Sequence, residues 1–283
     1  MYYLCPKFIT LKFNFQIKLY RKLRYRKGHR VHSPFAYDLI TRVIEEKTPY
    51  YVYEEIEIFR KASLSFENPL HLLTAEETQS PNYGALLFRL VNFFKCRTVL
   101  QIGGSTGLIG LYLALPLRKS CDCFVLEERK GLLENIQTFV NIHSLNNMYT
   151  MEGDYSVSLK DIRSKTETLD FIFINTMGNA KKTHEAIGLV ETFIFPDTVM
   201  VIDNISTDRE MKKLWKELKS RQDVRMTIDL LSLGLVFFNP RFHRQHYKNY
   251  FNDGKKQNLY QKRRRGFNIL SWRKKGIESR HTC

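Results

Sequence analysis

Short apolar runs alternate with segments of helical periodicity through the middle of this 283-residue chain. Their spacing is typical of an open α/β sheet, in which each buried strand is followed by a helix. The predicted strands cover residues 99–102, 123–126, 149–152, 169–175, 198–203, 224–229 and 233–238. The last two runs are too close together for a crossover helix, so they predict an antiparallel hairpin.

Helices are predicted between these strands and before the first of them. Ser33 followed by Pro34 is a typical helix start, because a side-chain oxygen can cap the first turn and proline fits its first position. The other predicted helices cover residues 83–94, 108–115, 130–140 and 209–220. We therefore predict a helical N-terminal extension over residues 1–60, an α/β domain over residues 61–252 and a flexible basic tail over residues 253–283.

The net charge of +16 is concentrated at the two ends of the chain. Residues 1–30 contain nine Lys or Arg and no acid, and residues 241–283 contain thirteen Lys or Arg and two acids. Aromatic residues are interleaved with these cations over residues 20–27 and 262–273, a composition that could hold RNA or an anionic membrane surface. The alternative is a solvated, charged segment that keeps the protein soluble.

The sequence predicts neither a membrane span nor a disulfide framework. No run of 18 apolar residues occurs, and lysines interrupt the N-terminal apolar runs, which argues against a secretory signal. The five cysteines are scattered and contain no Cys-x-x-Cys pair, so neither disulfides nor a zinc site are indicated. Cys121 and Cys123 are predicted to be buried as small apolar residues. We expect a reducing cytoplasm.

The turn after the first strand suggests a nucleotide-like ligand. Gly103, Gly104 and Gly107 allow the backbone to turn sharply and to approach a ligand closely, at the edge where open α/β sheets bind ligands. Glu127, predicted as an exposed acid at the tip of the second strand, could accept both hydroxyls of a ribose. The glycine spacing lacks the dinucleotide fingerprint, which favours an adenosine ligand without phosphates, most commonly S-adenosylmethionine. The alternative is an ordinary strand-to-helix connection.

Two sequence blocks, together with this turn, carry a resemblance to a known family. They are Gly28-His29-Arg30-Val31-His32-Ser33-Pro34-Phe35, and Thr227-Ile228-Asp229-Leu230 with Gly234-Leu235-Val236-Phe237-Phe238. Over most of residues 30–250 the chain resembles a class I S-adenosylmethionine-dependent methyltransferase, from a bacterial branch related to the small-molecule O-methyltransferases. The resemblance implies a seven-stranded, Rossmann-like sheet with an antiparallel closing hairpin and a helical N-terminal extension.

The resemblance also implies where the cofactor would bind. Gly103, Ser105 and Gly107 would hold its methionine part and Glu127 its ribose. Asp154 would accept from the adenine amino group, and the alternative for it is a plain turn residue after a glycine.

Several positions depart from the family's pattern. Gln101 stands where the first strand usually carries an acid, so it would contact the cofactor without adding negative charge. Asn175, Asp203 and Asn204 stand where related enzymes hold a divalent cation, and Asn175 is also counted with the cofactor-binding residues. One carboxylate and two amide oxygens would hold Mg²⁺ only weakly. The alternative for Asp203 is a helix cap or a loop hydrogen bond.

Methyl transfer needs alignment and a deprotonated acceptor, so one base in a dry pocket suffices. Asp203 is our first candidate for this base and His184 the second, with a solvated helix histidine beside Lys181 and Lys182 as the alternative. We predict a cytoplasmic enzyme that methylates a hydroxyl of a small molecule or glycan precursor. The alternatives are an RNA methyltransferase that uses the basic ends and a non-catalytic descendant that keeps cofactor binding.

Overall fold

A single mixed sheet forms the centre of the molecule. The computed structural model describes residues 16–63, 80–117, 121–142 and 145–253. The sheet has the strand order β3-β2-β1-β4-β5-β7-β6-β8. Its strands are β1 (Thr98–Ile102), β2 (Asp122–Glu127), β3 (Met148–Glu152), β4 (Phe171–Ile174), β5 (Val199–Asp203), β6 (Met226–Asp229), β7 (Leu233–Phe237) and β8 (Gln245–Lys248). Strands β1 to β5 are parallel, and β7 lies antiparallel between β5 and β6.

The predicted closing hairpin is confirmed, but the predicted number of seven strands is wrong. An eighth strand, β8, pairs in parallel with β6 at the sheet edge. Its sequence Gln245-His246-Tyr247-Lys248 is polar and short, and its side chains alternate between partly buried and exposed. Such an edge strand is held by backbone hydrogen bonds to its neighbour, so the apolar pattern of the sequence gives no signal for it.

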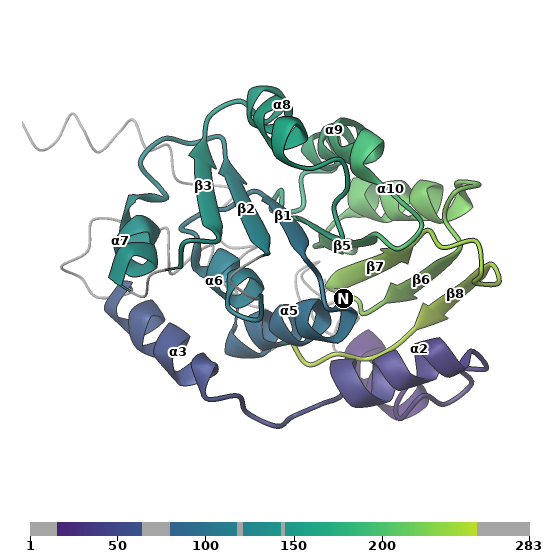
Figure 1. Ribbon diagram of the computed structural model, residues 1–283. Helices are drawn as coiled ribbons and strands as arrows, with labels where there is room; N and C mark the ends of the chain where they lie inside the picture. Colours follow the sequence, from purple (N-terminus) through teal and green to yellow (C-terminus); the bar gives the residue numbers. More distant parts are fainter. Residues whose placement is uncertain (1–15, 64–79, 118–120, 143–144, 254–283) are drawn as a thin grey trace, which may run out of the picture.

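Helices cover both faces of the sheet and form a three-layer α/β/α arrangement (Figure 1). One face carries α2 (Pro34–Leu39), the π-helical turn η1 (Ile40–Ile44), α3 (Val52–Ser63), α5 (Pro81–Phe94), α6 (Leu108–Ala114) and α7 (Glu134–Ile142). The other carries α8 (Tyr155–Lys165), α9 (Ala180–Val190), the short 3-10 turn η2 (Glu191–Phe193) and α10 (Arg209–Ser220). The five predicted helices all correspond to observed ones. The segment predicted from Ser33 is capped by that residue as expected, but it changes from α to π geometry at Ile40.

The N-terminal extension packs into the same core as the sheet. Phe35 stacks on Phe242 with 4.6 Å between ring centroids and meets Phe237 of β7 edge-on at 5.5 Å. The two sequence blocks that carry the family resemblance are therefore in direct contact. Because α3 runs to Ser63, the extension continues past residue 60. The domain boundaries stay a prediction, and residues 254–283 of the predicted tail lie outside the described residues.

Two predictions from composition can be compared with the structure. Cys121 and Cys123 are buried free thiols, as predicted, and burial raises the pKa of the Cys123 thiol well above its usual range. Across the described ranges, every helix is too short or too polar to cross a bilayer.

Candidate functional site

Four of the predicted site residues end adjacent strands at one edge of the sheet. The register of β1 with β2 and β4, and of β4 with β5, places Glu127, Gly103, Asn175 and Asp203 directly after aligned residue pairs. We call these four residues the carboxyl-edge row. In open α/β sheets this edge is where ligands bind. The structure therefore brings together residues that are up to 100 positions apart in sequence.

The glycine turn brings the backbone of β1 into contact with that of β4. Gly103 has φ +82°, and a Cβ on it would lie 1.8 Å from the carbonyl oxygen of Asn175. Gly107 caps α6 with φ +79°, where a Cβ would collide with Ile136 of α7. Ser105 between them also has a positive φ of 52°. No other residue fits at Gly103 or Gly107 without displacing a neighbouring strand or helix.

Glu127 is held beneath this turn rather than exposed at the tip of β2. Its residue exposure is 3%. The Ser105 amide N–H donates to Glu127 Oε2 at 2.6 Å, and the Arg129 amide N–H donates to Oε1 at 3.1 Å. The prediction of an exposed acid is therefore wrong, because the loop of residues 103–107 folds back over the end of β2. A ribose would meet Glu127 only on the side that the loop leaves open.

Arg129, which sequence reasoning missed, also binds Glu127. Its guanidinium donates from Nε to Glu127 Oε1 at 2.9 Å and from Nη2 to Oε2 at 3.1 Å. The Arg129 side chain is 44% exposed, whereas the Glu127 side chain is almost fully buried. The strand ends at Glu127 and residues 128 and 129 form a bend, so strand periodicity could not have predicted this contact.

Asp154 caps the helix that follows β3. Its Oδ1 accepts from the amide N–H of Ser156 at 2.7 Å and of Val157 at 3.3 Å. A hydrogen bond from the Ser156 hydroxyl, followed by these two backbone bonds, lowers the pKa of the Asp154 carboxyl. This geometry is the one expected from the turn-residue alternative. Both of these cap bonds go to Oδ1. A contact of the second carboxylate oxygen with adenine is therefore compatible with the cap and stays a prediction.

A cavity of about 430 Å³ opens beside Asp154, between the loops after β2 and β3 and helix α9. It is lined by Glu128, Asp154, Tyr155, Ser156, Lys182, Glu185, Ala186, Gly188 and Leu189. Lys182 Nζ lies 2.5 Å from Glu128 Oε2, so an ion pair joins α9 to the loop after β2. Burial, followed by the charges of Glu127 and Glu128, raises the pKa of the Tyr155 phenol. The cavity is lined by Glu128, the residue after Glu127, but by none of the carboxyl-edge row, and its volume is within the range of small-ligand sites.

Gln101 lies in the core below the glycine turn. It is fully buried, and its Nε2 donates to the carbonyl of Gly103 at 3.2 Å. Its Oε1 has no hydrogen-bond partner among the described residues, which is costly for a buried amide. The side chain points toward α6, where a Cβ on Gly110 would lie 3.4 Å from Oε1. A cofactor contact of Gln101 stays a prediction, and the observed role is to support the turn.

The three residues of the expected metal site do not form one in this structure. Asn175 Oδ1 accepts from the Met177 amide N–H at 3.2 Å. The two Asp203 oxygens accept from the amide N–H of Asn204 at 2.8 Å and from its Nδ2 at 2.7 Å. Asn204 therefore presents N–H groups to the Asp203 carboxylate, whereas a metal site would need its side-chain oxygen. Within the described ranges no group of three His, Cys, Asp or Glu side chains could hold a metal ion. The loop hydrogen bond is the observed role of Asp203, and a weak Mg²⁺ site at these three residues stays a prediction.

His184 lies apart from the carboxyl-edge row. It is exposed on α9, between the buried Thr183 and the exposed Glu185, with Lys181 and Lys182 in the preceding turn. Its position is that of the solvated-histidine alternative, and its role as a base stays a prediction.

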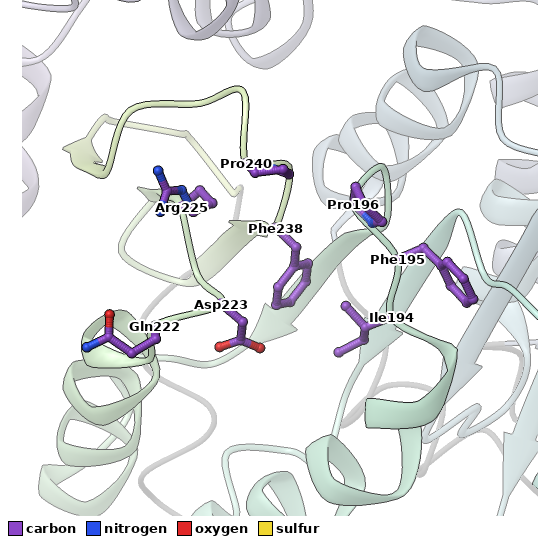
Figure 2. Close-up of a pocket in the computed structure, with 8 residues that line it drawn as sticks. All are labelled: Ile194, Phe195, Pro196, Gln222, Asp223, Arg225, Phe238 and Pro240. Atoms are coloured by element: carbon purple, nitrogen blue, oxygen red, sulfur yellow. The ribbon is translucent and has the colours of Figure 1, made fainter.

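A second cavity, of about 400 Å³, lies at the opposite edge of the sheet (Figure 2). Its lining residues precede β5 and β6 or follow β7: Ile194, Phe195, Pro196, Gln222, Asp223, Arg225, Phe238 and Pro240. None of the predicted site residues is among them. Asp223 is bonded bidentately by Arg221, which lowers the pKa of the Asp223 carboxyl. This cavity is therefore separate from the candidate site.

Comparison with known proteins shows which fold this is. No protein-family model matches the chain, and a search of curated proteins gives no sequence match. Among solved structures, the O-methyltransferase TomG of Streptomyces achromogenes, in complex with SAM, has a TM-score of 0.51 at 16% identity, over 68% of this chain and 91% of that one. The O-methyltransferase of Bacillus cereus, in complex with SAH, has a TM-score of 0.52 at 21% identity, over 69% and 95%. This chain has the O-methyltransferase fold.

A third structure agrees, that of a putative caffeoyl-CoA O-methyltransferase of Staphylococcus aureus, with a TM-score of 0.53 at 13% identity over 72% of this chain and 98% of that one. The shared fold comprises 68–72% of this chain and 91–98% of these neighbours. It covers less of this chain than of its neighbours, so part of the chain is additional to the shared fold.

Proposed function

We propose that the protein is an S-adenosylmethionine-dependent methyltransferase that methylates a hydroxyl of a small molecule or glycan precursor. The observation that carries the proposal is the carboxyl-edge row on a fold shared with O-methyltransferases, with a cavity of about 430 Å³ lined by Asp154 and by Glu128, the residue after Glu127. Two of the similar structures contain SAM or SAH. The proposal places this ligand at the carboxyl edge of the sheet in this chain.

The residues present fit an adenosine ligand. Glu127 is a buried carboxylate one residue before Glu128, and Glu128 lines the cavity together with Asp154 and with Tyr155 and Ser156 at the start of α8. The apolar side chains of Ala186 and Leu189 offer a face against which a base can lie. In this assignment Glu127 holds the ribose, Asp154 the adenine amino group and the 103–107 turn the methionine part. S-adenosylmethionine would supply an electrophilic methyl group on a sulfonium.

Asp203 is the base in this proposal. Its carboxylate is 1% exposed, lies at the end of β5 and is held through both oxygens by Asn204. A base at this place would take the proton of an acceptor hydroxyl, so that the oxygen attacks as the methyl leaves the sulfur. Asn204, with a positive φ of 59°, fixes the orientation of the carboxylate.

Cofactor binding is the first test. Isothermal titration of the full chain with S-adenosylmethionine should give a saturable heat, and Glu127→Gln should weaken the affinity at least tenfold because one of two charged acceptors for the ribose is lost. Glu217→Gln, an exposed carboxylate on α10, is the matched control and should leave the affinity unchanged. No binding by the wild-type protein would refute the proposal.

Catalysis is tested with a labelled methyl donor and a set of hydroxylated metabolites. Asp203→Asn should keep cofactor affinity and lower methyl transfer about 100-fold or more. His184→Gln should change transfer less than threefold, and the reverse ranking would make His184 the base. Tight binding of S-adenosylhomocysteine without transfer to any acceptor would favour the non-catalytic alternative instead.

A further inference from the structure

The N-terminal helical segment exposes an apolar face. Residues 16–24 are helical, and Leu19, Tyr20 and Leu23 are 44%, 56% and 73% exposed. Their spacing of one, three and four residues places them on the same side of the helix. Apolar residues on a helix normally face the core, so two exposed leucines beside an exposed tyrosine form an unusual outer surface.

The opposite side of this helix is fixed to the sheet. Arg21 is buried and makes a bidentate pair with Asp229 at the end of β6, with Nη1 2.7 Å from Oδ1 and Nη2 3.1 Å from Oδ2. Arg21 also donates to the carbonyls of Asp229 and Asn249, and Lys18 pairs with Asp253 at 3.6 Å. These contacts determine which face of the helix points outward. The leucines are exposed because the arginine is the buried anchor.

Exposed cations lie in the same segment as the apolar face and directly after it. Residues 16–37 contain seven Lys or Arg and no acid. Two of these cations, Lys18 and Arg21, are the anchors, and the exposed ones include Lys22, Arg26, Lys27 and Arg30. No acidic side chain in the described part of the chain forms an ion pair with these four. The surface thus combines exposed leucines with a local excess of positive charge.

We propose that this face docks on an anionic lipid bilayer, with Leu19, Tyr20 and Leu23 in the interfacial layer and the four cations at the headgroups. Interfacial helices combine an apolar face with a basic rim in this way. Tyrosine favours the membrane–water interface, where its ring contacts apolar groups and its hydroxyl reaches the polar headgroup layer. The alternative of RNA accounts for the charge and for Tyr20, which could stack on a base. It does not account for Leu19 and Leu23, which gain little from phosphates. This inference is independent of the proposed activity.

Vesicle co-sedimentation of the full chain tests the proposal. Binding should occur with vesicles of 30% phosphatidylglycerol in phosphatidylcholine, fall at least tenfold with pure phosphatidylcholine, and weaken as salt is raised. The double variant Leu19→Ser, Leu23→Ser should lower the partition coefficient at least tenfold at unchanged charge. Lys22→Glu with Arg26→Glu should lower it by a similar factor.

Matched controls separate this face from other sources of affinity. Ile58→Ser removes a 62% exposed apolar side chain from α3 and should leave the partition coefficient unchanged. Deletion of residues 254–283 should leave at least a third of the binding, and loss of all of it would overturn the proposal in favour of the C-terminal segment. Wild-type binding by the leucine double variant would also overturn it, as would concentration-dependent dimerisation that this variant abolishes. Salt-sensitive binding of an RNA oligomer without binding to vesicles would overturn the proposal as well.

Discussion

Replacing Glu127 should destabilise the protein as well as weaken ligand binding. The carboxylate is buried and accepts a charge-assisted hydrogen bond from the Ser105 amide, a contact worth about 1.5–3 kcal/mol. Its pair with Arg129 adds about 0–1 kcal/mol, because the arginine side chain is 44% exposed and solvent screens the attraction. Glu127→Ala removes both, so the free energy of unfolding should fall by about 1.5–4 kcal/mol.

Urea unfolding followed by circular dichroism measures this loss. Arg129→Met is the matched control, because it removes the ion pair and keeps both the Ser105 bond and an unbranched apolar side chain. Arg129→Met should lower the free energy of unfolding by less than about 1 kcal/mol. Glu127→Gln keeps an acceptor for Ser105 and should lie between the two. A loss below about 0.5 kcal/mol for Glu127→Ala would show that the turn does not depend on the carboxylate. Ligand affinities of Glu127 variants therefore need to be measured on protein shown to be folded.

Three other expectations follow from the same geometry. Gly103→Ala should lower the free energy of unfolding by about 3 kcal/mol or more, because its Cβ would overlap the Asn175 carbonyl at φ +82°. Gly188→Ala in α9, with open space around it, should raise the free energy of unfolding by about 0.5–1 kcal/mol. Equal changes in thermal unfolding for the two variants would refute the close approach at Gly103. Because the pKa of Asp223 is lowered in the folded state, its carboxylate stabilises the protein above the unfolded-state pKa of about 4, and this contribution is lost as the pH falls through the folded-state pKa. The difference in free energy of unfolding between the wild type and Asp223→Asn should therefore narrow below about pH 4 in acid unfolding curves. Deletion of residues 254–283 should change the free energy of unfolding by less than about 1 kcal/mol, and a truncated chain that does not fold would show that the segment is part of the domain.

Most of the fold could be predicted because its core is periodic. β1, β2, β4 and β5 are short apolar runs buried on both faces, and each is separated from the next by a helix-length segment, which leaves few topologies. β8 has no such run and is held by backbone pairing to β6. The π turn at Ile40 could not be predicted either, because its buried residues Ile40, Val43 and Ile44 are spaced as in an α-helix.

The candidate site was predictable in position but not in contacts. Register follows from the strands, so the residues at the ends of β1, β2, β4 and β5 could be expected to share one edge. Which groups they contact depends on loop conformation, and the loops here contain positive φ angles at Ser105, Met177 and Asn204. Such angles in residues other than glycine are uncommon, and nothing in the sequence marks them. The metal assignment stays a prediction for this reason, because the rotation of the Asn204 side chain decides whether it offers an oxygen or an N–H to the site.

The contacts of Glu127 also determine what ligand binding would involve. Its two oxygens accept from the Ser105 and Arg129 amides and from two guanidinium nitrogens, so a ribose cannot be added to a free carboxylate. Binding would exchange the Arg129 guanidinium, the half-exposed partner, for the ribose hydroxyls, while the Ser105 bond stays in place and keeps the carboxylate oriented. The exchange removes a screened ion pair worth about 0–1 kcal/mol, which is at most about a fivefold effect on affinity. Arg129→Met should therefore bind S-adenosylmethionine up to about fivefold more tightly than the wild type. A weaker affinity in titration calorimetry would show that the arginine contacts the ligand instead of competing with it.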